Sequence, residues 1–150
     1  MESKSRKIIK TVFAVHIIFV LIITFVIRET MTLRIPGSRN VILTPFREFD
    51  LFLHEPTHLF WFMQIFLNIL LFIPFGLMLP MIITKFRNPL MTSMTGLLFS
   101  GAIETMQYIT GRGLTEVDDV INNTIGTMIG YLFYAALMNL RKRHRDDELC

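Results

Sequence analysis

Apolar residues fall into four long runs, separated by segments that carry most of the charge. Three of the runs contain no acidic or basic side chain apart from His16, and the other contains only Glu104; the runs lie at 11–27, 59–84, 88–109 and 120–140. About 20 apolar residues are enough for a helix to cross the hydrocarbon core of a bilayer. We therefore predict an all-α, polytopic integral membrane protein. It is a single domain over 1–150, a compact bundle of four transmembrane helices at about 8–27, 59–84, 89–109 and 117–140.

Composition agrees with a membrane location. Hydrophobic residues make up 52% of the 150 residues, and the mean hydropathy is +0.51. A soluble protein would need far more polar chain to cover four helices that are apolar all round. The net charge of +3 does not indicate nucleic-acid binding, and the single cysteine, Cys150, excludes an internal disulfide.

The distribution of basic residues predicts the orientation. With four spans, the N-terminal tail, the turn between the second and third spans and the C-terminal tail lie on one side of the membrane. These segments hold ten of the fifteen Lys and Arg residues, including all five lysines. Lys and Arg concentrate in cytoplasmic loops. We expect a bacterial cytoplasmic membrane protein with both termini in the cytoplasm.

The longest connection, 28–58, is expected on the outer face. It contains a turn signal at 36–38. Over 46–53, Phe and Leu alternate with Arg47, Glu48 and Asp50, which predicts a short amphipathic helix on the outer leaflet or capping the bundle. A structureless loop is the alternative.

Polar residues occur at a similar depth in three of the spans. Glu104 lies in the third span with Gln107 one turn later, and Asn68 lies in the second span. At the start of the fourth span, Asp118 and Asn122 form one stripe with Asp119 and Asn123 beside it. Ionisable residues within membrane segments generally mark functional sites. We predict that these residues meet in one polar pocket near the exterior, with hydrogen bonds that only hold the bundle together as the alternative.

Other positions are expected to shape the bundle. Pro74 should kink the second span, and Gly126 and Gly130 give the fourth span a small-residue contact face. Thr115, with Asp118 three residues later, resembles a capping box at the start of that span.

The chemistry of the pocket is left open by the sequence. Glu104 is either protonated or held ionised by a cation and hydrogen-bond donors, and Arg112 is the nearest basic residue in sequence. Asp118 and Asp119 are hard oxygen ligands, but two aspartates in a first helical turn are more often caps. We assign no metal site, and no motif indicates a cofactor.

Several spaced motifs resemble the VanZ-like family of bacterial membrane proteins. They are Asn68 to Gly76 (NILLFIPFG), Glu104 with Gln107, the run from Asp118 to Gly126 (DDVINNTIG), and Asn40 with Thr44, Pro45 and Phe46 in the outer loop. The resemblance covers about residues 40 to 131. It implies functional or structural roles for Asn68, Pro74, Gly76, Glu104, Gln107, Asp118, Asp119, Asn123 and Gly126. It also implies an association with resistance to teicoplanin, a glycopeptide antibiotic with a lipid tail.

Three functions follow as hypotheses. The first is a binding module whose outer pocket, formed by the polar residues above with Arg112, holds a lipid-linked cell-wall precursor or a lipoglycopeptide, with membrane lipids around it. The second is an intramembrane enzyme acting on a lipid-linked cell-envelope substrate; we lean against it because no His, Ser or Cys nucleophile pairing is visible. The third, a proton-coupled carrier, is disfavoured because there is one mid-helix acid and no internal repeat.

Overall fold

The computed structural model describes residues 4–27, 41–112 and 114–147, and within them the chain is almost entirely helical. The predicted turn at 36–38 and Asn40 lie outside these residues. Four long helices and one short one are described: α1 (Lys4–Ile22), α3 (Arg47–His54), α4 (His58–Ile82), α5 (Pro89–Thr110) and α6 (Val117–Asp147). The all-α class is confirmed for this part of the chain.

Shorter elements connect or extend these helices. A π-helical turn, η1 (Ile23–Ile27), continues α1, and a 3-10 turn, η2 (Thr84–Arg87), links α4 to α5. Two strands of two residues, β1 (Val41–Ile42) and β2 (Thr115–Glu116), pair in parallel, with Val41 opposite Thr115. No sequence pattern predicts this pair, which ties the segment before α3 to the start of α6.

Three helices are long and apolar enough to cross a membrane: Lys4–Val26, His58–Ile82 and Val117–Asp147. The fourth predicted span, α5, is also long enough, since 22 residues rise about 33 Å. It is less apolar than the central part of a typical span because hydroxyl-bearing residues, Glu104 and Gln107 lower its mean hydropathy.

The boundaries of α5 follow from local chemistry. The Asn88 side chain accepts hydrogen bonds from the backbone N–H groups of Leu90 (2.9 Å) and Met91 (3.3 Å), and Pro89 occupies the first helical position. At the other end Gly111 adopts a left-handed conformation with φ of 65°, which glycine tolerates without steric cost. The predicted capping box at Thr115 is wrong. Helix α6 begins at Val117, and Thr115 lies in β2, where its hydroxyl donates to the carbonyl of Glu104 (3.3 Å).

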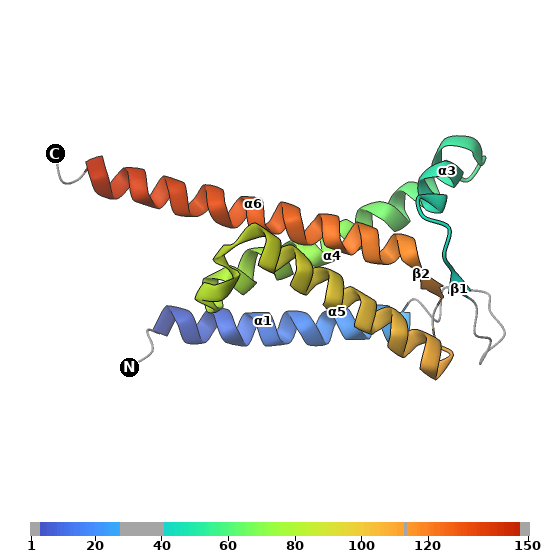
Figure 1. Ribbon diagram of the computed structural model, residues 1–150, viewed down its shortest axis with the longest axis horizontal. Helices are drawn as coiled ribbons and strands as arrows, with labels where there is room; N and C mark the ends of the chain where they lie inside the picture. The colour runs from blue at the N-terminus through green and yellow to red at the C-terminus, as the bar shows by residue number, and fades with distance from the viewer. Residues whose placement is uncertain (1–3, 28–40, 113, 148–150) are drawn as a thin grey trace.

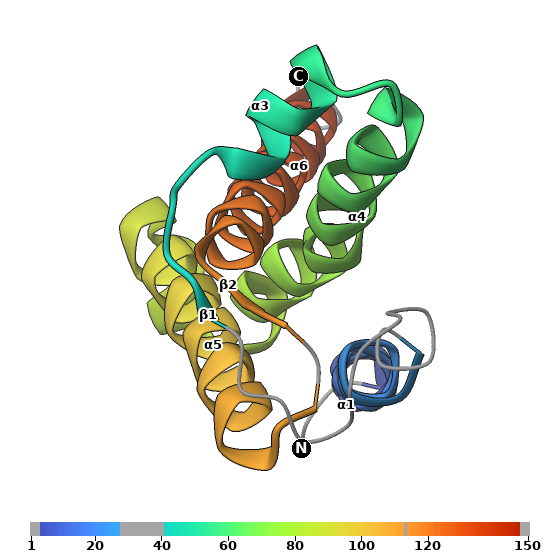
Figure 2. The ribbon, with the colours of Figure 1, turned by 90° about the vertical axis from the view of Figure 1, so that its right-hand side faces the viewer.

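The helices form an elongated bundle in which α6 packs against both α4 and α5, and α1 lies along α4 (Figure 1). The short elements α3, β1 and β2 gather at one end. The first turn of α1, the α4–α5 link and the last turns of α6 lie at the other end. Seen along the bundle in Figure 2, α3 covers the end of the α4–α6 pair.

The interior of this bundle is more polar than its surface. Among the described residues, thirteen polar or charged residues are buried, against seven hydrophobic ones. Large apolar side chains such as Leu98, Leu132 and Leu59 are instead more than 60% exposed. This distribution is the reverse of that in a soluble domain, and it suits a protein whose helices are held together in lipid by polar and small residues.

The closest helix contact is between α4 and α6. A Cβ atom added at Gly76 would overlap the backbone carbonyl of Thr127, and one added at Gly126 would overlap that of Ile69. Gly130 faces the carbonyl of Ile73 in the same way. These three glycines let the two backbones approach closely. Helix α4 runs unbroken through Pro74 at this contact.

Candidate functional site

A single aspartate of α6 holds the first turn of α3. The carboxylate of Asp118 accepts hydrogen bonds from the backbone N–H groups of Phe46 (2.6 Å) and Glu48 (2.7 Å). Helix α3 has no side-chain cap of its own, and the first N–H groups of a helix lack partners within it. Asp118 therefore acts as a cap supplied from about seventy residues away, and its negative charge also suits the positive end of the helix dipole.

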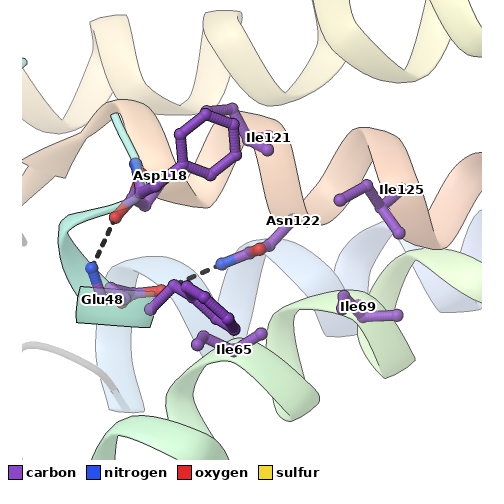
Figure 3. Close-up of a pocket in the computed structure, with 9 residues that line it drawn as sticks. Glu48, Ile65, Ile69, Asp118, Ile121, Asn122 and Ile125 are labelled. Carbon is purple, nitrogen blue, oxygen red and sulfur yellow. Dashed lines mark hydrogen bonds between the residues drawn. The ribbon is translucent and has the colours of Figure 1, made fainter. Parts of the chain in front are cut away.

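A second hydrogen bond joins α6 to α3, one turn after Asp118. Glu48, only 1% exposed, accepts a hydrogen bond at Oε2 from Nδ2 of Asn122 (2.9 Å) (Figure 3). Pro45 lies immediately before Phe46, which has a positive φ of 60° and turns the chain into α3. The stripe predicted on α6 thus faces α3.

The neighbouring stripe of α6 points to the other two helices of the site. Nδ2 of Asn68 on α4 donates to Oδ1 of Asp119 at 2.5 Å, and both residues are buried. Nδ2 of Asn123 donates to the hydroxyl of Ser100 on α5 (2.8 Å), while its buried Oδ1 has no hydrogen-bond partner among the described residues. Three helices therefore contribute polar groups around one face of α6.

Glu104 of α5 completes this arrangement by fixing β2. Its Oε2 accepts a hydrogen bond from the backbone N–H of Glu116 (2.9 Å). Glu104 thus binds the residues just before α6. Glu116 in turn pairs with Arg47 (3.4 Å), whose guanidinium lies 5.5 Å from the ring centre of Trp61.

The result is a concentration of buried acid. Five carboxylates are buried in this part of the described chain, at Glu48, Glu104, Glu116, Asp118 and Asp119. Oxygen atoms of Glu48, Glu116 and Asp119 all lie within 4.8 Å of one another, a spacing that allows a metal ion to be held. Carboxylate oxygens are the ligands that hard divalent cations prefer. This trio differs from the Asp118 and Asp119 pair considered from sequence, because Asp118 uses both oxygens to cap α3.

An apolar cavity of about 350 Å³ adjoins these polar groups. Its walls are isoleucines of α4 and α6, and its polar end is formed by Glu48, Asp118 and Asn122, with Phe46 and Phe49 at the α3 side. Figure 3 shows Ile65 and Ile69 on one helix and Ile121 and Ile125 on the other, with the Glu48–Asn122 hydrogen bond at one end. The cavity thus has apolar walls and a polar end.

Two further predicted site residues contact other parts of the chain. Gln107 is buried, but its Nε2 donates to the backbone carbonyl of Thr24 (3.2 Å) in η1, so it contacts the first helix. Arg112 is exposed in the turn after α5, where its backbone N–H donates to the carbonyl of Gln107 (3.2 Å).

Two acids of the site, Glu48 and Glu116, were not selected from sequence. Glu48 lies on the inner side of α3 with Leu51 and Phe52, which are half-buried, so an acid on the inward face of an amphipathic helix was the available signal. No sequence pattern indicates the pairing of Glu116 with Arg47.

A polar interior within an apolar surface, with several helices able to cross a bilayer, defines the class of multi-pass membrane proteins. A model of the VanZ/LLP1 family matches residues 12–139, and the chain belongs to that family. Protein VanZ of Enterococcus faecium is 33% identical over 87 residues, which are 54% of this chain and 47% of that protein. The chain thus spans about half the length of this relative in the match. No solved structure matches significantly.

Proposed function

We propose that this protein is a four-span member of the VanZ/LLP1 family in the bacterial cytoplasmic membrane and that it binds an acyl-bearing ligand at its outer-leaflet end. The ligand is a lipid-linked cell-wall precursor or a lipoglycopeptide, and binding it contributes to teicoplanin resistance. The observation that carries the proposal is the cavity beside α3, whose walls are apolar and whose end is acidic.

The arrangement of charge supports the orientation. The first turn of α1, η2 and the last turns of α6 lie at the end of the bundle opposite α3. The basic residues of the predicted cytoplasmic segments, ten of fifteen in the chain, belong to that end. With that end in the cytoplasm, α5 crosses the membrane beside α6, and α3 lies at the outer surface.

The outward side of α3 supports an interfacial position. Leu53 is more than half exposed, and so are Phe46 and Phe49 at the edge of the cavity, while the acid Glu48 is buried. Apolar side chains on the outer face of a short helix insert readily at the boundary between headgroups and acyl chains. Helix α3 then covers a cavity that a molecule from the outer leaflet can reach sideways.

The two parts of the cavity select for an amphiphile. The isoleucine walls suit an acyl chain, because burial of each CH₂ group contributes about 0.8 kcal/mol. Carboxylate and amide groups at the other end suit hydroxyl or ammonium groups that donate hydrogen bonds. A glycopeptide with a lipid tail, or a glycolipid precursor, carries both kinds of group.

A resistance assay tests the proposal in cells. Wild-type protein expressed in a sensitive bacterium should raise the inhibitory concentration of teicoplanin, and Ile125→Trp, which fills the cavity, should abolish the increase. Leu132→Trp is the matched control, since Leu132 is on the same helix, 64% exposed and outside the cavity. If wild type gives no protection, the resistance proposal fails; if both tryptophan variants protect equally, the cavity is irrelevant to it.

A binding assay tests the ligand class directly. The purified full-length protein should bind teicoplanin in preference to the same glycopeptide from which the acyl chain has been removed. Glu48→Gln and Asn122→Leu, which change the polar end of the cavity, should weaken this binding. Equal binding of the acylated and deacylated forms would contradict a role for the apolar walls.

The spacing of Glu48, Glu116 and Asp119 favours a second candidate, an intramembrane enzyme for lipid-linked substrates. A divalent cation held by these three carboxylates would polarise a phosphoryl or carbonyl oxygen, with Glu104 as general acid or base. Its test is turnover of a lipid-linked envelope substrate by purified protein. Activity should be lost with a chelator, restored by Mg²⁺ or Mn²⁺, and absent in Glu116→Gln; activity indifferent to chelators would contradict the metal-dependent form.

A further inference from the structure

A second cavity lies at the opposite end of the bundle, away from α3. It measures about 340 Å³ and lies between the first turns of α1, the α4–α5 link and the second half of α6. None of its lining residues belongs to the acidic site described above. The charged residues that line it are basic, whereas those that line the cavity beside α3 are acidic.

Three arginines from three separate elements line this cavity. Arg6 belongs to α1, Arg87 to η2 and Arg141 to α6, and no acidic residue is among the lining residues. The hydroxyl-bearing residues Ser5 and Thr84 also line it. Guanidinium groups bind phosphate through paired N–H groups, and hydroxyl groups add further donors. The lining therefore offers several donors and a strong positive charge to one anion.

Hydrogen bonds between elements hold two of these arginines in position. The guanidinium of Arg6 donates to the backbone carbonyl of Ile82 (2.8 Å), the last residue of α4. The hydroxyl of Tyr131 on α6 donates to the backbone carbonyl of Arg87 (2.8 Å). The first bond fixes a side chain and the second fixes the turn that carries the other arginine. A preorganised site loses less entropy when it binds a ligand.

Apolar residues occupy the same cavity. Ile9, Met81 and Met138 line it together with the arginines. A site for a small soluble anion does not need apolar residues. A phospholipid does suit them, because its glycerol and the start of its acyl chains lie next to its phosphate. Basic pockets between membrane helices on the cytoplasmic side are suited to anionic headgroups.

We propose that this arginine cavity binds a phosphate group at the cytoplasmic surface, and that its physiological source is an anionic phospholipid of the inner leaflet. The proposal does not rest on the ligand proposed for the α3 end. It assigns to the molecule a second binding site, of opposite charge, on the other side of the membrane.

The test uses the purified full-length protein in a neutral detergent, with binding followed by native mass spectrometry. Phosphatidylglycerol should bind in preference to phosphatidylcholine. Each arginine removed from a membrane-surface site costs about fivefold in affinity, so Arg87→Gln combined with Arg141→Gln should weaken phosphatidylglycerol binding roughly 25-fold. Both arginines are exposed, so the double variant should keep the thermal unfolding midpoint of the lipid-free protein.

The matched control is Arg143→Gln, an exposed arginine on the same helix that does not line the cavity. It should bind phosphatidylglycerol as wild type does. Inorganic phosphate distinguishes the two sources: competition at millimolar concentration assigns recognition to the phosphate alone, and no competition assigns it to the whole lipid. Equal binding of the two lipids without competition by phosphate would overturn the proposal, as would an Arg143→Gln variant weakened as much as the double variant.

Discussion

The amide of Asn68 donates a hydrogen bond to the carboxylate of Asp119 across the contact between α4 and α6. Both side chains are buried, and the glycines at positions 126 and 130 begin less than two turns further along α6. One polar bond and one close backbone contact therefore set how the two longest helices meet. The acidic site is built on this junction.

Replacing Asn68 should weaken the fold. In Asn68→Leu the Asp119 carboxylate loses a donor in a buried position, and we expect the free energy of unfolding to fall by about 2–3 kcal/mol. The measurement is unfolding of the purified protein in detergent by titration with SDS. Gln64→Leu, the same chemical change one turn earlier on α4, should cost less because Gln64 makes no hydrogen bond with the described residues.

A double-mutant cycle measures the interaction free energy between Asn68 and Asp119 apart from the other contributions of each residue. Asp119→Leu combined with Asn68→Leu should be less destabilising than the sum of the single changes, since neither polar group is then left without the other. Additive effects would show that the two residues do not stabilise each other. Asn68→Leu no worse than Gln64→Leu would contradict the role given to this bond.

Removing the cap supplied by Asp118 should release α3. We expect Asp118→Ala to expose the inner face of that helix, because two backbone N–H groups lose their acceptor. In a Cys150→Ser background, Leu51→Cys should react faster with a water-soluble maleimide once Asp118 is removed. A lost cap of about 1–2 kcal/mol corresponds to a rate increase of roughly 5- to 30-fold.

Asp50→Ala provides the control for that experiment. Asp50 lies in the same first turns of α3, but its side chain is exposed and contacts His54 rather than α6. Its loss should leave the labelling rate of Leu51→Cys unchanged. If Asp118→Ala also leaves the labelling rate of Leu51→Cys unchanged, α3 is held mainly by its contacts with α4.

How much of this site could be foreseen depends on the distance in sequence between partners. The stripes on α6 follow from helical periodicity, so the shared faces of Asp118 with Asn122 and of Asp119 with Asn123 were predictable. The α3 partners of Asp118 and Asn122 lie about seventy residues away, and no local pattern identifies them. Gln107 illustrates the same limit, because its i+3 spacing from Glu104 suggested one site, whereas its amide contacts the carbonyl of Thr24.

The short elements were the least predictable part of the fold. Strands β1 and β2 have two residues each, too few for an alternating pattern, and they pair across more than seventy residues of sequence. The amphipathic pattern did indicate a helix over 46–53, and α3 spans Arg47–His54. The long helices followed from hydropathy, although α5 and α6 both contain buried polar residues that contact neighbouring helices.

The proposed orientation predicts which residues an impermeant reagent can reach. In intact cells the native Cys150 should not react with a membrane-impermeant maleimide, because the C-terminus is expected in the cytoplasm. In a Cys150→Ser background, His54→Cys on exposed α3 should react. Permeabilising the cells should make Cys150 reactive, which serves as the control for its accessibility, and labelling of Cys150 in intact cells would contradict the orientation.

The contact between α4 and α6 should tolerate no side chain at Gly76. In Gly76→Ala the new Cβ would overlap the backbone carbonyl of Thr127, and a backbone atom cannot move aside as the end of a flexible side chain can. We expect a loss of about 1–3 kcal/mol in the free energy of unfolding, the usual range for overpacking.

Gly101→Ala on α5 is the matched control. A Cβ there meets no atom of the described residues within 4 Å, so the substitution should be neutral or stabilise the helix by up to about 1 kcal/mol. Similar stabilities for the two variants would show that the helices separate easily at this point, and the acidic site would then lack the rigid junction on which its geometry depends.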